Sequence, residues 1–343
     1  MQHFYATTET TNLRCNPAIE PRSQSDIING RVVEHSPQAM NSFFTRRHFL
    51  ATAALATCSL HAAVPARRVG LGVSLYGMKT LPVADALRVC AETGFQDVEF
   101  ALNPGYPTEP KLLSAAQRKE LRAQLAGLGL RLAALMDNFH LTADDPAHAT
   151  NLERTKAAAQ LAHDLAPDAP PVLETVMGGK PAEWDKVKAQ MAARLADWGR
   201  TAAAAKLTLC IKPHVGSAAH LPEHALWLLD QVKNPAVKLA YDFSHYQLRG
   251  VDLGQSLDAL LPHTRFIHVK DSVGELGKFQ FVLPGEGKID YADYFRRLKA
   301  ANWSGSVCVE VSGQVFSKPG YDPVAAAKKS YAALAPAFQA AGL

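Results

Sequence analysis

Four short runs rich in β-branched residues, all in the C-terminal half of the chain, end in charged or imidazole side chains. The runs are Ile211-Lys212-Pro213-His214, Tyr241-Asp242-Phe243-Ser244-His245, Ile267-His268-Val269-Lys270-Asp271 and Val309-Glu310-Val311-Ser312. Asp242, His268 and Glu310 carry the carboxylate and imidazole groups that bind Mn²⁺, Mg²⁺ or Zn²⁺ in proteins. The runs therefore predict a divalent metal site in which these three side chains are the ligands.

Lys212 is the exception in this set, because it offers an ammonium group where a fourth ligand would complete the site. His214 lies two residues further on, on the same face of a strand, and is available as that fourth ligand. Alternatively, the ammonium of Lys212 neutralises Asp242 and Glu310, which gives a salt-bridged cluster without a metal ion. Both alternatives stay open at the level of the sequence.

A carboxylate and an amine beside one carbonyl group can move a proton, and this is the chemistry that we expect from Glu310 and Lys212. Isomerising or epimerising a carbonyl compound removes a proton next to the carbonyl while a cation or hydrogen-bond donor stabilises the enediolate oxygen. One acid and one amine suit β-elimination, or the reverse hydration, equally well. Glu310 is the predicted base, and burial beside a metal ion would lower the pKa of Lys212 towards a usable value. The predicted substrate contacts are His245, His214, Glu99, Glu174, Lys270 and Phe281, with His140 on the same side.

The elements that must position these residues are short apolar runs that alternate with longer segments of helical period. The strands are predicted over residues 69–76, 95–101, 130–136, 171–177, 207–213, 237–243, 265–271 and 306–311, and the helices over 82–93, 112–128, 149–165, 181–205, 221–232, 253–261, 291–301 and 324–341. Strand and helix pairs in this order predict an α/β fold, a single closed (β/α)8 TIM barrel whose active site lies at the carboxyl ends of the strands. A doubly wound open sheet is the alternative, but no glycine-rich phosphate loop follows the first strand.

The first 66 residues do not share this alternation. Arg46-Arg47, followed by Phe49-Leu50 and an apolar stretch over 51–63, resembles a twin-arginine export signal, and the stretch is too short to span a bilayer of ~30 Å. We expect a disordered extension or mis-assigned start over 1–39, a cleavable signal over 40–66 and the barrel over 67–343. The resemblance implies a periplasmic protein that is not held in a membrane after cleavage.

Charge and cysteine content exclude two classes of protein. The net charge is +4, and no basic run after residue 68 provides the footprint of a nucleic-acid binder. Cys90, Cys210 and Cys308 are an odd set in predicted helix and strand segments, so we expect buried thiols rather than a disulfide framework. Phe279-Gln280-Phe281, in a long loop after the seventh strand, is predicted to be a lid over the substrate or a patch for homo-oligomer formation.

From Val69 to Leu343 the chain resembles the xylose isomerase-like TIM barrels, a superfamily of sugar phosphate isomerases and epimerases. The segments that carry the resemblance are Gly94–Glu99, Tyr241–His245, Ile267–Asp271, Leu283–Asp290 and Gly305–Glu310. It implies that Asp242 and His268 bind metal and that His245 binds substrate, whereas metal-binding members place a glutamate where Lys212 stands. The resemblance implies a sugar isomerase or epimerase whose partner is a small carbohydrate and whose lid, over residues 279–281, covers that sugar. The alternatives are a lyase or hydratase acting on a keto-sugar or keto-glycoside, and a non-catalytic periplasmic carbohydrate-binding barrel.

Overall fold

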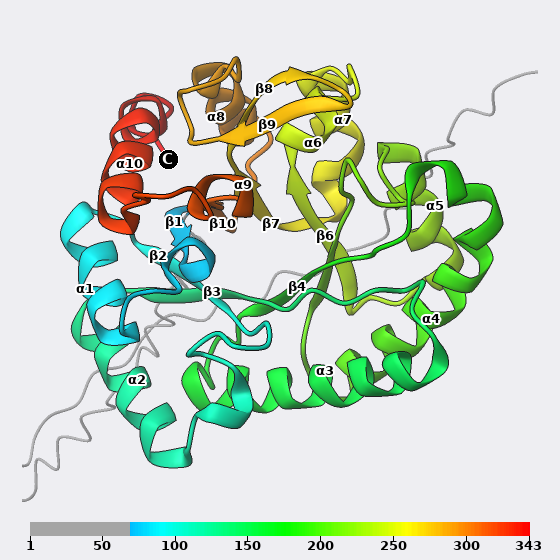
Figure 1. Ribbon diagram of the computed structural model, residues 1–343, viewed down its shortest axis with the longest axis horizontal. Coiled ribbons are helices and arrows are strands. Elements are labelled where there is room, and N and C mark those ends of the chain that lie inside the picture. Colours follow the sequence, from blue (N-terminus) through cyan, green and yellow to red (C-terminus); the bar gives the residue numbers. More distant parts are fainter. Residues whose placement is uncertain (1–68) are drawn as a thin grey trace, which may run out of the picture. The chain divides into compact units, whose positions relative to one another are not determined.

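The computed structural model describes residues 69–343, which form a closed parallel β-barrel surrounded by helices (Figure 1). Its strands are β1 Gly70–Ser74, β2 Asp97–Ala101, β3 Arg131–Met136, β4 Val172–Val176, β5 Leu209–Lys212, β6 Val237–Asp242, β7 Thr264–Val269 and β10 Ser306–Val309. Neighbouring strands follow the order β1-β10-β7-β6-β5-β4-β3-β2, and pairing of β1 with β10 closes the barrel. The predicted (β/α)8 fold is confirmed. The expected signal segment, residues 40–66, and the extension before it lie outside the described residues.

The outer layer consists of helices that follow the barrel strands. They are α1 Val83–Thr93, α2 Ala115–Gly127, α3 Asp145–Leu165, α4 Trp184–Ala204, α5 Pro222–Val232, α7 Leu253–Leu260, α8 Tyr291–Ala300 and α10 Pro323–Ala340, with the short helices α6 Phe243–Gln247 and α9 Gly313–Phe316 after β6 and β10. Helix α3 begins four residues before the predicted start at 149, because the Asp144 carboxylate caps it by accepting a hydrogen bond from the backbone N–H of Ala147. Within residues 69–343, no helix is both long and apolar enough to cross a membrane.

Inside the barrel, an apolar layer lies beneath a charged one. The apolar layer consists of Ala134, Cys210, Ala240, Phe266 and Cys308. Two residues further along the same segments come Lys212, Asp242, His268 and Glu310. Residues i and i+2 point to the same side of a strand. Because the apolar residues point into the barrel, the charged residues two positions later point inward as well. The free thiols of Cys90, Cys210 and Cys308 are buried, as the sequence predicted.

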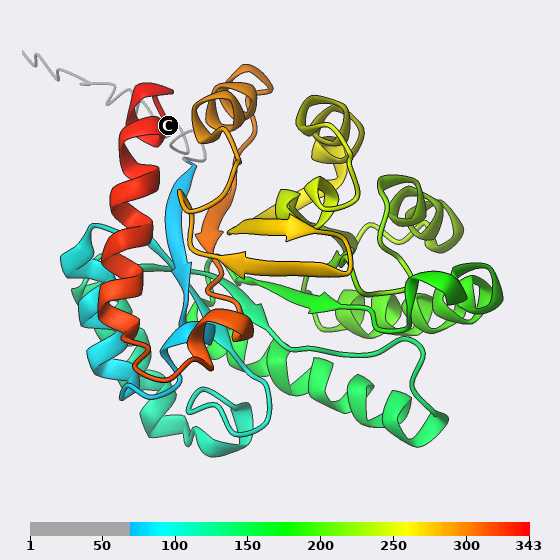
Figure 2. The same cartoon turned by 45° about the horizontal axis from the view of Figure 1, so that its top comes forward.

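The segment after β7 is a β-hairpin rather than the predicted long loop. The strand β8 Asp271–Glu275 pairs antiparallel with β9 Lys278–Val282 (Figure 2). Gly277, in the turn between them, has φ +93°, a conformation that side chains other than glycine rarely adopt. Strand β7 accordingly ends at Val269, two residues before its predicted end. The hairpin is held to α9, because the Gln314 side-chain oxygen accepts a 2.7 Å hydrogen bond from the backbone N–H of Phe281.

Candidate functional site

A cavity of about 410 Å³ opens at the carboxyl ends of the barrel strands. Its volume falls within the range of roughly 300–1,000 Å³ that is usual for small-molecule sites. The lining residues are Tyr76, Asn138, His140, Val176, Gly178, Gly179, Lys212, His214, Gly216, Ser217, Lys270, Phe281, Glu310, Ser312 and Gly313. The structure thus brings the ends of β5, β7 and β10 together at the mouth where the sequence placed the chemistry.

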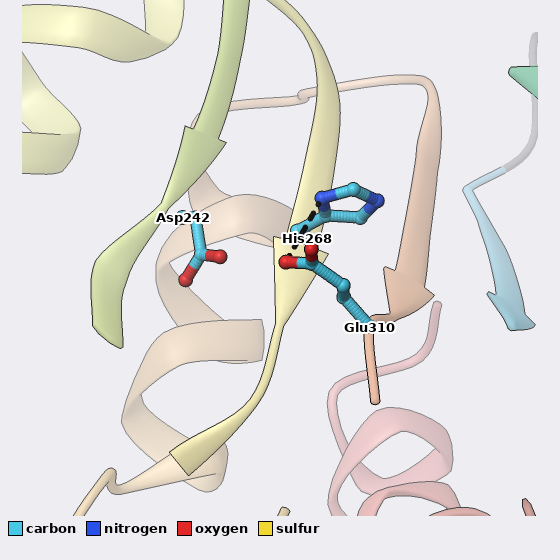
Figure 3. A group of neighbouring side chains, drawn as sticks. All are labelled: Asp242, His268 and Glu310. Atoms are coloured by element: carbon cyan, nitrogen blue, oxygen red, sulfur yellow. Dashed lines mark ion pairs between the residues drawn. The ribbon is translucent and has the colours of Figure 1, made fainter. Parts of the chain in front are cut away.

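Glu310 follows β10 and brings its carboxylate to the cavity floor. Its Oε2 atom lies 2.5 Å from Nζ of Lys270, 3.3 Å from Nζ of Lys212 and 3.5 Å from Nδ1 of His268; the last of these contacts is drawn in Figure 3. Burial alone would raise the pKa of Glu310, but the ammonium groups of Lys212 and Lys270 are the leading electrostatic causes that outweigh burial and hold it well below its usual value. Glu310 is therefore an ionised carboxylate.

Lys270 bridges two carboxylates on different strands. Its Nζ donates hydrogen bonds to Oδ2 of Asp242 and Oε2 of Glu310. The other Asp242 oxygen, Oδ1, accepts hydrogen bonds from the backbone N–H of Ser244 at 3.1 Å and from its hydroxyl at 2.6 Å, at the start of α6. The Phe281 ring covers the ammonium at 4.9 Å from its centroid. Lys270 thus joins β7, β6 and the end of β10 under the hairpin.

Lys212, at the end of β5, is a buried ammonium among acidic groups. Its Nζ lies 3.1 Å from Oε1 of Glu174 and 2.9 Å from Nδ1 of His268, besides its contact with Glu310. Burial would lower the pKa of Lys212, but the surrounding carboxylates, led by Glu174 and Glu310, raise it above its usual value. The lowered pKa expected from the sequence depended on a metal ion beside Lys212, whereas the protein groups alone shift the pKa upwards. Lys212 therefore carries a positive charge at neutral pH.

His268, on β7, connects the two sides of the barrel. Its Nε2 lies 2.8 Å from Oε2 of Glu99, which comes from β2, and its Nδ1 faces Lys212. Because an ammonium can only donate, Nδ1 accepts and Nε2 carries the proton that Glu99 accepts. Both ring nitrogens of His268 are thus engaged by side chains of this chain.

Glu99 and Glu174, which the sequence predicted as substrate contacts, lie behind the cavity floor. Both are completely buried, and neither is among the cavity-lining residues. Burial raises the pKa of Glu174 above its usual value, although the nearby Lys212 opposes the shift. These carboxylates contact Lys212 and His268 rather than the open cavity, so the structure assigns them a supporting position.

His214, His245 and Phe281 form an aromatic wall beside the ammonium of Lys270. The ring centroids of His214 and His245 are 4.0 Å apart, and those of His245 and Phe281 are 5.0 Å apart. Burial, reinforced by Lys270, lowers the pKa of His214 to about 4, and burial also holds the pKa of His245 well below its usual value. Both imidazoles are therefore neutral at pH 7 and suited to hydrogen bonds with hydroxyl groups. His214 and Phe281 line the cavity, while His245 lies behind them.

Three further polar residues line the cavity that the sequence analysis did not single out: Tyr76, Asn138 and Ser217. Tyr76 stacks on Tyr106 at 5.6 Å and meets Phe316 edge-on at 5.1 Å. Tyr76 and Asn138 each follow the carboxyl end of a barrel strand, β1 and β3. Tyr76 and Asn138 would both have been found if the residues after the carboxyl end of every barrel strand had been considered, and not only those after the strands that end in charged residues.

Asp242, His268 and Glu310 lie together as the sequence predicted, with one ligand atom from each within 4.8 Å of the others (Figure 3). His214 is not part of this group and packs against His245 instead. In type and spacing the three donors suit a divalent ion. The charges around them do not, because the ammonium groups of Lys212 and Lys270 already contact the same atoms.

Comparison with known proteins gives consistent matches. The family model described as "Xylose isomerase-like TIM barrel" matches residues 87–336. L-ribulose-5-phosphate 3-epimerase UlaE of Salmonella typhi is 24% identical over 258 residues, which are 70% of this chain and 87% of that protein. Among solved structures, the 3-keto-D-glucoside 4-epimerase YcjR of E. coli has a TM-score of 0.63 and 17% identity, over 78% of this chain and 100% of that one. The probable 3-DHS dehydratase AsbF of Bacillus anthracis has a TM-score of 0.64 and 18% identity, over 77% and 98%. The structural likenesses show a shared fold.

Proposed function

The chain belongs to the xylose isomerase-like TIM barrel family, and from this premise we propose that it is a sugar isomerase or epimerase that moves a proton on a carbon beside a carbonyl group. The observation that carries the proposal is the floor of the cavity. There an ionised carboxylate, Glu310, lies within 3.3 Å of two ammonium groups, those of Lys212 and Lys270. A base beside cationic hydrogen-bond donors is what enolisation of a sugar requires.

In the proposed reaction, Glu310 takes the proton from the carbon, and the electron pair of the broken C–H bond forms the enediolate. A carboxylate of lowered pKa is always ionised but weakly basic, so the enediolate must be strongly stabilised. The ammonium of Lys212, which lines the cavity, donates a hydrogen bond to the developing oxyanion. One such donor typically contributes about 10²–10³ in rate.

Among residues 69–343, Glu310 is the one carboxylate that lines the cavity. The ammonium of Lys212 gives a proton to the former carbonyl oxygen and takes the hydroxyl proton of the deprotonated carbon, and the single base, Glu310, then returns its proton on the same face to the neighbouring carbon. Epimerisation at one carbon needs a second proton donor on the opposite face. We therefore favour isomerisation over epimerisation.

A lyase or hydratase acting on a keto-sugar is the second candidate, and the same single carboxylate supports it. After Glu310 has removed the proton beside the carbonyl, the ammonium of Lys212 can protonate the leaving hydroxyl, so that water departs and a double bond forms. The two candidates share their first step and differ in the fate of the enediolate.

Proton exchange with solvent tests both candidates. The protein is incubated in D₂O with neutral aldoses and ketoses, with 3-keto-glucosides and with L-ribulose 5-phosphate, and carbon-bound deuterium is followed by NMR. We expect exchange into at least one substrate class, lost in Glu310→Gln and kept in Lys278→Met, which changes an exposed lysine of β9. Formation of an unsaturated product identifies the lyase. Binding of a sugar with neither exchange nor turnover would refute catalysis and leave the carbohydrate-binding barrel.

We also propose that the protein is exported to the periplasm, on the strength of the twin arginines Arg46-Arg47. N-terminal sequencing of the protein recovered from a periplasmic fraction should give a start near residue 66. A cytoplasmic protein that retains residues 40–66 would contradict this.

A further inference from the structure

We propose that the ammonium of Lys270, with that of Lys212, takes the place of a divalent metal ion in this barrel, so that the site works without metal. The inference rests on the proposed function only for what the positive charge does during the reaction. Whether a metal ion binds is a separate matter, which can be measured without any substrate.

The position of Lys270 carries the inference. Its Nζ donates to Asp242 and to Glu310, the two carboxylates of the candidate metal site, and so bridges them as a bound cation would. The side chain is 3% exposed. Phe281 covers the ammonium on one side, and Nε2 of His245 lies 3.3 Å from it on another. The ammonium is therefore enclosed in the middle of the ligand group.

Lys212 engages the remaining donors. Its Nζ lies 2.9 Å from Nδ1 of His268 and 3.3 Å from Oε2 of Glu310. The second ring nitrogen of His268 faces Glu99. The ligand atoms of Asp242, His268 and Glu310 that face one another are thus each in contact with an ammonium group of this chain.

The charges at the candidate ligand atoms point the same way. The carboxylates of Asp242 and Glu310 contact the ammonium groups of Lys212 and Lys270, and all four side chains are buried, with the carboxyl groups of Glu99 and Glu174 behind them. A divalent ion at the same atoms would lie against two ammonium groups, and repulsion of like charges is strong where water is excluded. Glu174, which lies behind the cavity floor, also contacts Lys212 and so anchors the ammonium further.

The path of the backbone after β7 explains why the ammonium of Lys270 lies between Asp242 and Glu310. Lys270 follows His268 by two residues at the end of β7, so both side chains point into the barrel. The hairpin of β8 and β9 then folds back and places Phe281 over the ammonium. The sequence raised the alternative that the ammonium of Lys212 neutralises Asp242 and Glu310. In the structure it is Lys270 that bridges these two carboxylates, whereas Lys212 bridges Glu174 and Glu310.

Metal analysis tests the inference directly. The full chain is purified without chelators, incubated with excess Mn²⁺, passed through a desalting column and analysed for metal by mass spectrometry. We expect less than about 0.1 Mn²⁺ per chain, and no change in thermal unfolding with Mn²⁺ or EDTA. About one tightly held ion per chain, or a lowered melting temperature in EDTA, would overturn the proposal.

Two substitutions test whether the ammonium groups of Lys212 and Lys270 are the reason that no divalent ion binds. Lys270→Met removes the bridging charge, and combining it with Lys212→Glu also supplies a carboxylate at the end of β5. We expect the double variant to bind Mn²⁺ at least tenfold more tightly than the wild type by calorimetry, while Lys278→Met stays like the wild type. Equal affinity of the double variant and the wild type would contradict the assigned cause. If the variants do not fold, the metal content of the wild type still decides.

The failure of this inference is distinguishable from failure of the proposed function. Deuterium exchange that EDTA abolishes would refute the metal-free site and leave the sugar isomerase intact. A protein that holds no metal and exchanges no proton into any sugar would refute the proposed function and leave the metal-free site intact.

Discussion

Replacing Lys212 by methionine keeps most of the side-chain volume and removes a buried positive charge. The Lys212 side chain is 2% exposed, and its Nζ lies within 3.3 Å of carboxylate oxygens of both Glu174 and Glu310. Removing one partner from a buried ion pair typically costs about 3–5 kcal/mol, because the remaining charge is left without compensation. Set against a typical total of roughly 5–15 kcal/mol, that loss should leave Lys212→Met folded but clearly less stable.

The loss should depend on pH. In the wild type the pKa of Glu310 is held well below its usual value, with Lys212 the leading electrostatic cause. A depressed carboxyl pKa contributes stability above the unfolded pKa of about 4.3, and this contribution disappears as the pH falls through the folded pKa. Without Lys212 the pKa of Glu310 rises, so part of that contribution is missing at neutral pH. The difference between variant and wild type should therefore be largest above about pH 5 and shrink as the pH falls below about 4.3 towards the folded pKa of Glu310.

Urea unfolding at about pH 7.5, 5.5 and 3.5, followed by circular dichroism, measures this difference on both sides of the unfolded carboxyl pKa, with Lys278→Met as the matched control. A free-energy difference below about 1 kcal/mol at pH 7.5, typical of an exposed ion pair, would refute the assignment of Lys212 as a buried charge partner. A large difference that stays constant over the three pH values would refute the coupling to Glu310.

Three other substitutions test separate parts of the site. Phe281→Ala removes the ring that covers Lys270; because cation–π contacts contribute about 0.5–2 kcal/mol, we expect KM for the sugar to rise about 2–30-fold, and an unchanged KM would argue against Phe281 as part of the lid. His214 has a folded pKa of about 4, so the unfolded chain binds a proton below about pH 6.5 that the folded chain does not. Stability should thus fall between pH 6.5 and 4, and His214→Gln should reduce this slope by up to about 1.4 kcal/mol per pH unit in urea titrations, whereas an unaltered slope would show that His214 is not the group involved. At Gly287, an added Cβ would lie 2.7 Å from Cβ of Asp271; Gly287→Ala should therefore cost about 1–3 kcal/mol of stability, and a melting temperature equal to that of the wild type would contradict this close packing.

Much of the site followed from the sequence because a barrel strand obeys a two-residue period. Once Cys210, Phe266 and Cys308 point inward, the residues two positions later must do so as well. The order of the strands then brings Asp242 and His268 side by side, and these two residues are paired in the register of β6 and β7. The inward direction of the metal-type ligands and their meeting at one mouth were therefore predictable.

Other features depend on contacts between different elements of the fold, which a local sequence pattern does not predict. The turn at Gly277 and the pairing of Phe281 with Ser272 build a hairpin from what the sequence suggested was a loop. Glu99 meets His268 although β2 and β7 are separated by β1 and β10 in the barrel. Neither contact follows from residues that are near one another in the chain.

The sequence by itself determined the barrel, the mouth and the identity of the acidic, basic and imidazole groups there, because strand periodicity and strand order are local properties. Only the tertiary structure decided which ammonium meets which carboxylate. A lysine side chain has a flexible stem of four carbons, so its ammonium can reach groups on several neighbouring strands. Packing against Phe281 and the surrounding carboxylates selects one arrangement, in which Lys270 bridges Asp242 and Glu310 and Lys212 bridges Glu174 and Glu310.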